Sequence, residues 1–566
     1  MDFFDVQMYA SVKLLCVTFI AAAIYLVYKK KDPIYFLILV GLVSATAYIF
    51  LTSGLDLSFW GLQGDEVTIA AMYNTFAHVG LGADFAYHSL PPFYPPGFFW
   101  FFGAIGGMMN WNGVIIGKFA AFIFFLFFPL GLYLFQKYLS SGSIVKGEFD
   151  NKIFTLLSPL LIMTVLEKDV LLGKPYEVIA AAMVILWCVA LYQKLVSGKF
   201  GWKDYCLYGL IAGIILMTYY LWLIFGAIAL LLMGLVEKFG SRINYFAKLV
   251  RVALLSILVS LPFIWPFVMS SWRNGLESWQ IFFFTPKGLD LWLPMFQLAS
   301  INNLIMLFGL ATLIYCRNNV IIKQLGYLFG AAFIWWVMGI VSLLIFKIPF
   351  QEFRGFYILS PIILVLAAAY GIQALWMYSK IDRNKNLRLT ILVLAVLYFT
   401  SQSMFGFFID DYYVKLRRTE SRTLAPGLIS LISFLKSTDN SDSMITLQTI
   451  PKLLAFTPIN NLLYFNQDLN NPAAVFSERY KYVQSLASAK SSAELYQIVQ
   501  ACPYGPLERF IFQEKKDGYY LYVTLTKLIE GAETQDIIMD KDLFASDYFD
   551  KVYDQDGYVV IMTRAK

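Results

Sequence analysis

The chain has 566 residues, of which 59% are hydrophobic and only 14% are charged. Soluble globular proteins contain about 25% charged residues, and the mean hydropathy here is +0.63. This composition excludes a water-soluble enzyme and indicates an integral membrane protein. The net charge of +6 predicts no nucleic-acid partner, because the basic residues are divided among short loops between apolar segments. The five cysteines indicate no disulfide framework.

About twelve apolar segments are candidates for membrane spans. A helix that crosses a bilayer needs about 20 apolar residues. The segments lie near 8–28, 34–54, 113–136, 153–167, 174–194, 204–219, 221–237, 246–270, 299–316, 324–346, 356–378 and 389–409. Of these, 153–167 and 204–219 are short for a full span. The first segment is expected to be a span rather than a cleaved signal peptide, because acidic residues precede it.

The basic residues predict how the spans are oriented. Cytoplasmic loops collect Lys and Arg, and Lys29-Lys30-Lys31 follows the first span. This places the first loop inside and the N-terminus outside. The later inner loops also carry Lys or Arg, whereas the outer loops are mixed or acidic. We therefore expect a multi-pass protein of the bacterial inner (cytoplasmic) membrane with both termini on the extracytoplasmic side.

The character of the chain changes after residue 409. The tail 410–566 has ordinary polarity, alternating stretches at 519–523 and 558–562, and a helix-like run near 477–501. Such a mixture predicts a small α+β domain outside the membrane. The expected fold is a polytopic α-helical membrane domain, 1–409, with its first large outer loop at 55–112, followed by the extracytoplasmic domain 410–566.

The first outer loop opens with Gly64-Asp65-Glu66. Asp65 stands where the N-cap of a helix over 66–79 is expected, and Glu66 in the first turn suits the helix dipole. A purely structural role is therefore open for Glu66. Asp65 is a candidate functional residue, because a carboxylate at the membrane end of a span is costly unless it is paired or used.

Both histidines of the chain lie in the same loop. A straight helix would hold His78 about 20 Å from Asp65, at ~1.5 Å per residue, which excludes a shared site. His88 follows two glycines and Asp84, so the chain can turn back toward Asp65. Asp65, Asp84 and His88 are therefore a candidate divalent-metal site. A solvated surface histidine is the alternative, and no other cofactor is predicted.

Two stretches carry a family resemblance. One is 84–100, DFAYHSLPPFYPPGFFW, whose prolines lead into an apolar run expected to be an interfacial helix. The other lies in the tail between 477 and 519. With the early acidic pair and the outer tail domain, they resemble the GT-C membrane glycosyltransferases. Within that class they resemble the galactan arabinofuranosyltransferases of actinobacterial cell walls, often called AftA.

The resemblance implies the reaction. The donor would be a polyprenyl phosphate carrying a furanose, with β-D-arabinofuranose as the leading candidate. The sugar would move, with inversion, to a cell-envelope acceptor outside the membrane. Inversion needs a carboxylate that takes the acceptor proton, for which Asp65 is the first candidate and Glu66 the second. Tyr94, Asp84 and His88 are further substrate-binding candidates.

The leaving lipid phosphate needs cations close to it. The candidates at outer helix ends are Arg354, Lys347, Arg273, and Lys168 or Lys174. Arg354 is preferred, and a helix-end arginine paired with Glu352 is the alternative. A second acidic group, Glu167 and Asp169, could hold the donor, a metal or the acceptor, or it could be an ordinary charged turn.

The composition leaves the acceptor open. The chain is rich in Lys, Ile, Phe, Asn and Tyr and poor in Ala and Arg, which is unlike an actinobacterial protein. A pilin-type protein hydroxyl is therefore an alternative to a galactan-like glycan. One rival function is a GT-C transferase for polyprenyl-phosphate mannose, glucose or aminoarabinose. Others are a lipid-linked sugar transporter or flippase and a non-catalytic scaffold. A transporter is disfavoured because the charges cluster at helix ends and in loops.

Overall fold

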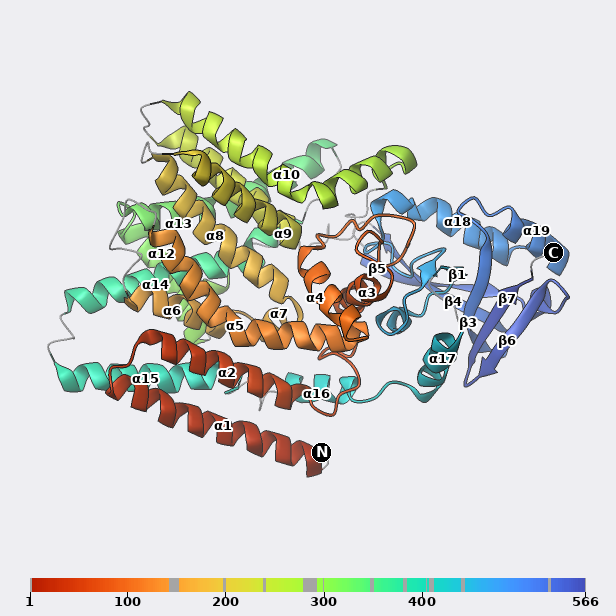
Figure 1. Ribbon diagram of the computed structural model, residues 1–566, viewed down its shortest axis with the longest axis horizontal. Helices are drawn as coiled ribbons and strands as arrows, with labels where there is room; N and C mark the ends of the chain where they lie inside the picture. The colour runs from red at the N-terminus through yellow and green to blue at the C-terminus, as the bar shows by residue number, and fades with distance from the viewer. Residues whose placement is uncertain are drawn as a thin grey trace.

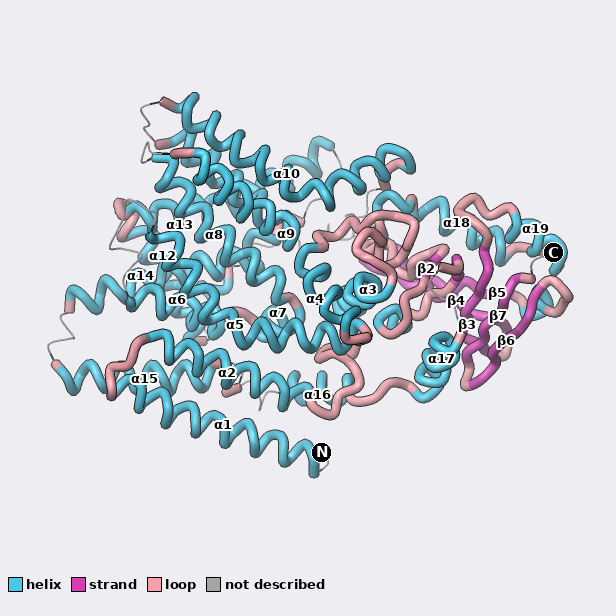
Figure 2. The backbone as a smooth tube through the Cα atoms, viewed as in Figure 1, coloured by secondary structure: helices cyan, strands magenta, loops and turns pink. Residues whose placement is uncertain are grey.

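The computed structural model describes residues 3–141, 152–196, 200–237, 241–277, 293–298, 300–346, 351–379, 384–403, 405–406, 412–438, 443–527 and 531–564. The elements lie along one long axis, with a bundle of long helices at one end and a sheet domain at the other (Figure 1). Figure 2 shows the strands gathered at the sheet end. Helices α3 (Asp65–His78) and α4 (Gly97–Met108) lie between the two parts.

Eight of the described helices are long and apolar enough to cross a membrane. They are α1 (Phe3–Tyr28), α2 (Pro33–Thr52), α5 (Gly113–Ser141), α8 (Pro175–Val196), α9 (Trp202–Val236), α10 (Arg242–Asn274), α13 (Val320–Phe346) and α14 (Ser360–Tyr378), which a π-helical turn, Gly355–Leu359, precedes. The shorter helices α6 (Lys152–Val165), α12 (Ile301–Tyr315) and α15 (Lys385–Gln402) pack in the same bundle. The count of about twelve spans stays a prediction.

Helix α9 is two arms that fold back on each other at Tyr219, where φ is −163° and ψ is 96°. In the first arm, the carbonyl of Tyr208 accepts from the Trp187 indole N–H at 3.0 Å. In the second arm, a Cβ added to Gly226 would lie 2.8 Å from Cys188 Sγ. Eighteen residues of straight helix would separate these two contacts by about 27 Å. Two separate apolar segments are predicted here from the sequence, and the two arms correspond to them.

Helices α8 and α14 are the most buried of the eight membrane-length helices, and residues at their N-terminal ends contribute to the candidate site. Within their most apolar windows, 83% of the residues of α8 and 78% of those of α14 are buried, against 17% for α1. Because the surfaces of α8 and α14 are covered by other helices, polar side chains at their ends face protein rather than lipid. Helix α8 begins with Pro175, and the π-helical turn before α14 begins with Gly355. Each of these residues follows a basic residue, Lys174 or Arg354.

The C-terminal domain is a mixed sheet with helices. Its strands are β1 (Ile445–Leu447), β2 (Asn460–Asn461), β3 (Leu507–Lys515), β4 (Gly518–Lys527), β5 (Gly531–Met539), β6 (Phe549–Gln555) and β7 (Tyr558–Thr563). The order is β2-β1-β3-β4-β5, with β7 paired to β3 and β6. Strand β1 is parallel to β2 and β3, and the other pairs are antiparallel. Helices α17 (Pro426–Ser437), α18 (Phe476–Ala487) and α19 (Ser492–Gln500) complete it. Helix α16 (Tyr412–Ser421) lies beside the end of α2 (Figure 1), where Arg418 donates to the Leu51 carbonyl.

Buried polar contacts join the C-terminal domain to the first large loop. The Asn74 side-chain amide donates to the Leu454 carbonyl at 3.0 Å, and the backbone N–H of Asn461 donates to the Ala86 carbonyl at 2.8 Å. The hydroxyls of Thr68 and Tyr464 lie 3.1 Å apart. Since these groups are buried, separating the two parts would leave them without partners at a cost of about 1–3 kcal/mol each. The sheet domain is thereby held against α3.

Candidate functional site

A cavity of about 90 Å³ lies where α3, α8, the tip of α9, the turn before α14 and the C-terminal domain meet. Its wall combines carboxylates, an arginine and tyrosines with apolar side chains. The lining residues are Asp65, Thr68, Ile69, Met72, Phe93, Tyr94, Tyr176, Glu177, Tyr219, Tyr220, Leu221, Gln351, Arg354, Asp468 and Leu469. The cavity therefore combines residues that are about 400 positions apart in the sequence.

Asp65 is the first residue of α3 and follows Gly64, whose φ of 54° makes the sharp entry into the helix. Its carboxylate lies 2.7 Å from Lys174 Nζ, yet 45% of its side chain remains open. Lys174 beside it holds the pKa of Asp65 below its usual value, against the effect of burial. Asp65 is therefore a carboxylate at neutral pH, and part of it faces the cavity.

Four charged side chains form one chain of ion pairs, which we call the charged quartet: Asp65, Lys174, Glu177 and Arg354. Lys174 Nζ lies 3.9 Å from Glu177 Oε1, and an Arg354 guanidinium nitrogen lies 3.5 Å from Glu177 Oε2. Burial disfavours the charge of Lys174, but Asp65 and Glu177 outweigh it and raise the pKa of Lys174. The two acids and two bases sum to zero formal charge. Such alternation makes a buried charged site tolerable.

Tyrosines form another part of the wall. The hydroxyls of Tyr94 and Tyr176 lie 3.0 Å apart, and the Tyr219 ring is 6.3 Å from Tyr94 and 6.1 Å from Tyr176. Tyr94 comes from the proline-rich strip, and Tyr219 is the residue at which α9 folds back. Burial raises the pKa of Tyr94, so it stays a neutral phenol that can donate or accept a hydrogen bond.

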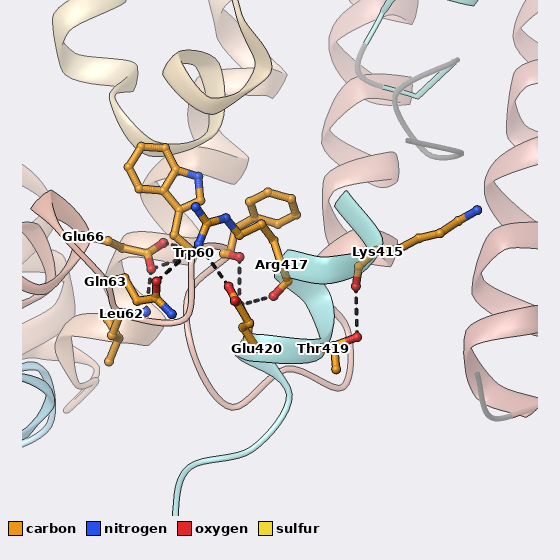
Figure 3. A network of polar contacts seen from close by, with 10 residues as sticks. Trp60, Leu62, Gln63, Glu66, Lys415, Arg417, Thr419 and Glu420 are labelled. Carbon is orange, nitrogen blue, oxygen red and sulfur yellow. Dashed lines mark hydrogen bonds and ion pairs between the residues drawn. The ribbon is translucent and has the colours of Figure 1, made fainter. Parts of the chain in front are cut away.

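Glu66 does not face this cavity. Its carboxylate accepts hydrogen bonds from the backbone N–H groups of Trp60 at 3.1 Å and Leu62 at 2.8 Å (Figure 3). Arg417 of α16 lies in the same region and contacts Gln63 and Glu420. Burial raises the pKa of Glu66 to about 7, although these backbone donors oppose the shift. The geometry matches the structural role left open for Glu66: it holds the turn that leads into Asp65.

Asp84 and His88 lie against the C-terminal domain rather than beside Asp65. Asp84 is fully buried and accepts from the backbone N–H groups of Ala86 and Tyr87 at 3.0 and 3.1 Å. The backbone N–H of His88 donates to Asn460 Oδ1 at 3.0 Å. Within the described ranges, no group of three His, Cys, Asp or Glu side chains is placed to hold a metal ion. The structure thus does not bring the three candidate metal ligands together.

The remaining candidates fall in different places. Glu167 is exposed and Asp169 half-buried at the start of α7 (Lys168–Gly173), and Arg273 is exposed near the end of α10. None of these three lines the cavity. Lys168 donates to the Met163 and Thr164 carbonyls at 3.3 Å, at the end of α6. Lys347 lies outside the described residues.

Arg354, the preferred candidate for binding the donor phosphate, lines the cavity. Its partner is Glu177, whereas the sequence suggested the neighbouring Glu352. Glu177 itself is not among the residues predicted from the sequence. Because it is an acidic residue inside an apolar segment, the high cost of such a group in a membrane was a signal that could have found it. Its fully buried neighbour Trp222 donates to its carbonyl at 2.9 Å and ties α9 to α8.

A bundle of membrane-length helices with a charged cavity beside an extramembrane sheet domain defines a polytopic membrane protein with a site at one end of its bundle. The chain belongs to the arabinofuranosyltransferase family: the family described as "Arabinofuranosyltransferase N terminal" matches residues 6–400. It is therefore a membrane glycosyltransferase, and the predicted polytopic helical protein with a C-terminal α+β domain is confirmed. The matched region contains the whole charged quartet.

Solved structures give more distant similarities. ArnT from Cupriavidus metallidurans in the apo state has a TM-score of 0.48 and 14% identity, over 79% of this chain and 90% of that chain. The same enzyme bound to undecaprenyl phosphate has a TM-score of 0.47 and 13% identity, over 92% and 96%. The arabinofuranosyltransferase AftD from Mycobacteria has a TM-score of 0.48 and 9% identity, over 93% of this chain but 40% of that chain. No curated protein sequence matches the chain.

Proposed function

We propose that this enzyme transfers arabinofuranose from a polyprenyl phosphate to a hydroxyl acceptor, with inversion, on the extracytoplasmic side of the bacterial cytoplasmic membrane. Asp65 is the base that takes the acceptor proton. The observation that carries the proposal is the position of the charged quartet. Asp65, Glu177 and Arg354 line a cavity that adjoins a large apolar groove, and Lys174 is ion-paired with Asp65. Family membership supports the sugar, and the groove supports the lipid carrier.

The groove has a volume of about 790 Å³ and runs between the second arm of α9 and α10. It shares Phe93 and Tyr220 with the cavity. Its other lining residues are Leu216, Leu223, Ile224, Ala227, Phe263, Ile264, Phe267, Leu276, Glu277 and Pro472. A polyprenyl chain is a branched hydrocarbon, and a groove of this composition suits such a chain. A lipid lying in the groove would place its headgroup in the adjoining cavity.

The cations of the charged quartet suit the phosphate of such a donor. Arg354 donates through Nε to Gln351, while its contact to Glu177 is 3.5 Å long. A guanidinium has five N–H donors, so Arg354 keeps donors for a phosphate oxygen. Lys174 supplies a second positive charge. Arg354 and Lys174 attract the phosphate of the donor, and the carboxylates of Asp65 and Glu177 repel it. Because the quartet has no net charge, the lipid phosphate is held weakly enough to leave after transfer.

The transfer is a single displacement. The acceptor oxygen attacks the anomeric carbon from the face opposite the phosphate, and a new C–O bond forms as the bond to the phosphate oxygen breaks. The electron pair of the broken bond stays on the phosphate, whose charge Arg354 and Lys174 stabilise. Asp65 takes the proton of the acceptor hydroxyl. A β-arabinofuranosyl donor therefore yields an α-linked product.

A donor panel tests this function. The purified enzyme in lipid nanodiscs is given synthetic polyprenyl phosphates carrying β-D-arabinofuranose, mannose, glucose or aminoarabinose. Acceptors are a galactofuranose oligosaccharide and a serine peptide. We expect turnover with the arabinofuranosyl donor and an α linkage in the product. Turnover with the mannose, glucose or aminoarabinose donor, and none with the arabinofuranosyl donor, would overturn the assigned donor. Movement of intact donor across a vesicle without cleavage would instead identify a flippase.

A further inference from the structure

Glu277, which follows α10, joins the end of that helix to the C-terminal domain. Its carboxylate accepts from the backbone N–H of Ser477 at 2.8 Å and from the Ser477 hydroxyl at 2.6 Å. The Gln467 side-chain amide donates to the same carboxylate at 3.4 Å, and the Glu277 backbone N–H donates to the Pro472 carbonyl at 3.0 Å. The end of α10 therefore lies beside the start of α18 (Figure 1).

Glu277 supplies an N-terminal cap that α18 does not have in its own segment. The N-cap residue of α18 is Val475, whose side chain makes no capping hydrogen bond. The first N–H groups of a helix have no partner inside the helix, and the helix dipole favours a carboxylate beside them. Ser477 lies in the first turn of α18, so the membrane part of the chain provides the acceptor that Val475 cannot. One contact thus positions both α18 and the end of α10.

The segment that Glu277 holds is part of the wall of the apolar groove. Glu277 and Pro472 both line the groove. The Asn471 side-chain amide donates to the Pro91 carbonyl at 2.9 Å, which ties the same segment to the proline-rich strip that carries Phe93. Because Phe93 lines both the groove and the cavity, the segment is held close to the place where the groove and the cavity adjoin.

We propose that the C-terminal domain takes part in binding the lipid donor, and that Glu277 is the positioning residue that holds Pro472 in the wall of the groove. This inference rests on the proposed function, because it takes the groove as the site of the polyprenyl chain. The other lining residues of the groove lie within the family match at 6–400, whereas Pro472 lies outside it. The isoprene units nearest the phosphate would contact this wall on their way into the cavity.

The end of α10 depends on these polar contacts for its position. Residues 272–276 are exposed, so this end of the helix has little apolar packing of its own. Without the Glu277 carboxylate, Leu276 and Pro472, which both line the groove, are free to move apart. A wider groove buries less of the hydrocarbon chain, and the affinity for an apolar chain falls with the area that is buried.

The test compares the full-length Glu277→Gln variant with the wild type in nanodiscs, with polyprenyl phosphate as the probe. Glutamine keeps the shape but has only one acceptor oxygen, so it cannot accept both hydrogen bonds from Ser477. We expect the Kd for polyprenyl phosphate and the donor KM to rise roughly 5- to 20-fold. The acceptor KM should not change, because contacts such as that between Thr68 and Tyr464 still hold the domain against α3. Glu478→Gln, an exposed change at the next residue of α18, should leave all three values unchanged.

A second variant, Ser477→Ala, removes the hydroxyl from the other side of the contact and carries the test if Glu277→Gln does not fold. It should raise the lipid Kd roughly 2- to 5-fold, and its effect should not add to that of Glu277→Gln in the double variant. An unchanged lipid Kd in both variants would overturn the inference. An equal loss of acceptor affinity would also overturn it, because it would show that the whole domain has shifted. If the wild type binds polyprenyl phosphate but transfers no arabinofuranose, the proposed sugar has failed and the inference stands.

Discussion

The ion pair between Asp65 and Lys174 makes a quantitative prediction about pH. Lys174 lowers the pKa of Asp65, so replacing it by methionine should raise that pKa. At 2.7 Å and an effective dielectric constant of about 20, two unit charges interact by about 6 kcal/mol. Because 45% of the Asp65 side chain is open, solvent screening leaves about 1–3 kcal/mol. That corresponds to roughly one to two pKa units.

The assay is the pH dependence of kcat/KM for transfer. A base with a lowered pKa is ionised above that value, so activity of the wild type should fall only below the usual aspartate value of 3.8. In Lys174→Met the acid limb should move up by roughly one to two units, whatever the loss in kcat from the missing phosphate contact. Lys174→Arg keeps the cation and should keep the limb low. If the limb of the methionine variant does not move, Lys174 does not set the pKa of the base.

Three further changes have clear expected outcomes. Burial raises the pKa of Glu66 to about 7 from an ordinary value of 4.5. The contribution of Glu66 to stability is therefore fully present below 4.5 and falls by about 3 kcal/mol as the pH rises to 7. Thermal unfolding of Glu66→Gln, compared with the wild type over this pH range, should lack that contribution. Ala227→Trp fills the groove and should raise the donor KM at least tenfold, whereas Ala253→Trp on an exposed part of α10 should not. Gly113→Ala places a methyl group against the Ala70 carbonyl and should cost about 1–3 kcal/mol of stability in unfolding measurements.

Local patterns predicted much of the fold. Apolar segments predicted the long helices, including the two arms of α9, because length and hydrophobicity are local properties. The alternating sequence patterns at 519–523 and 558–562 predicted the strands that contain these residues, β4 and β7. The family resemblance and the charge pattern also led to Asp65, Arg354 and, as one of several cations, Lys174. These residues stand at helix ends, where a charged side chain next to an apolar segment is visible in the sequence.

The pairing of the site residues could not be predicted, because it is set by tertiary packing. Arg354 lies two positions from Glu352 in the sequence, but α8 brings Glu177 to it. Glu66 turns away from its neighbour Asp65 because the chain at Leu62, with a φ of 54°, offers backbone N–H groups to its carboxylate. Asp84 and His88 contact the C-terminal domain instead, through hydrogen bonds with Asn471 and Asn460. No local pattern encodes these partners.

Measuring donor binding and transfer separately in Asp65→Asn tests whether Asp65 is the base. Asparagine keeps the side-chain shape but cannot take a proton at neutral pH. We predict that the variant still binds the arabinofuranosyl donor, measured by titration in nanodiscs, while single-turnover transfer falls by at least 100-fold. Asp547→Asn, at a fully exposed site, should match the wild type. Transfer by Asp65→Asn at a near wild-type rate would show that Asp65 is not the base.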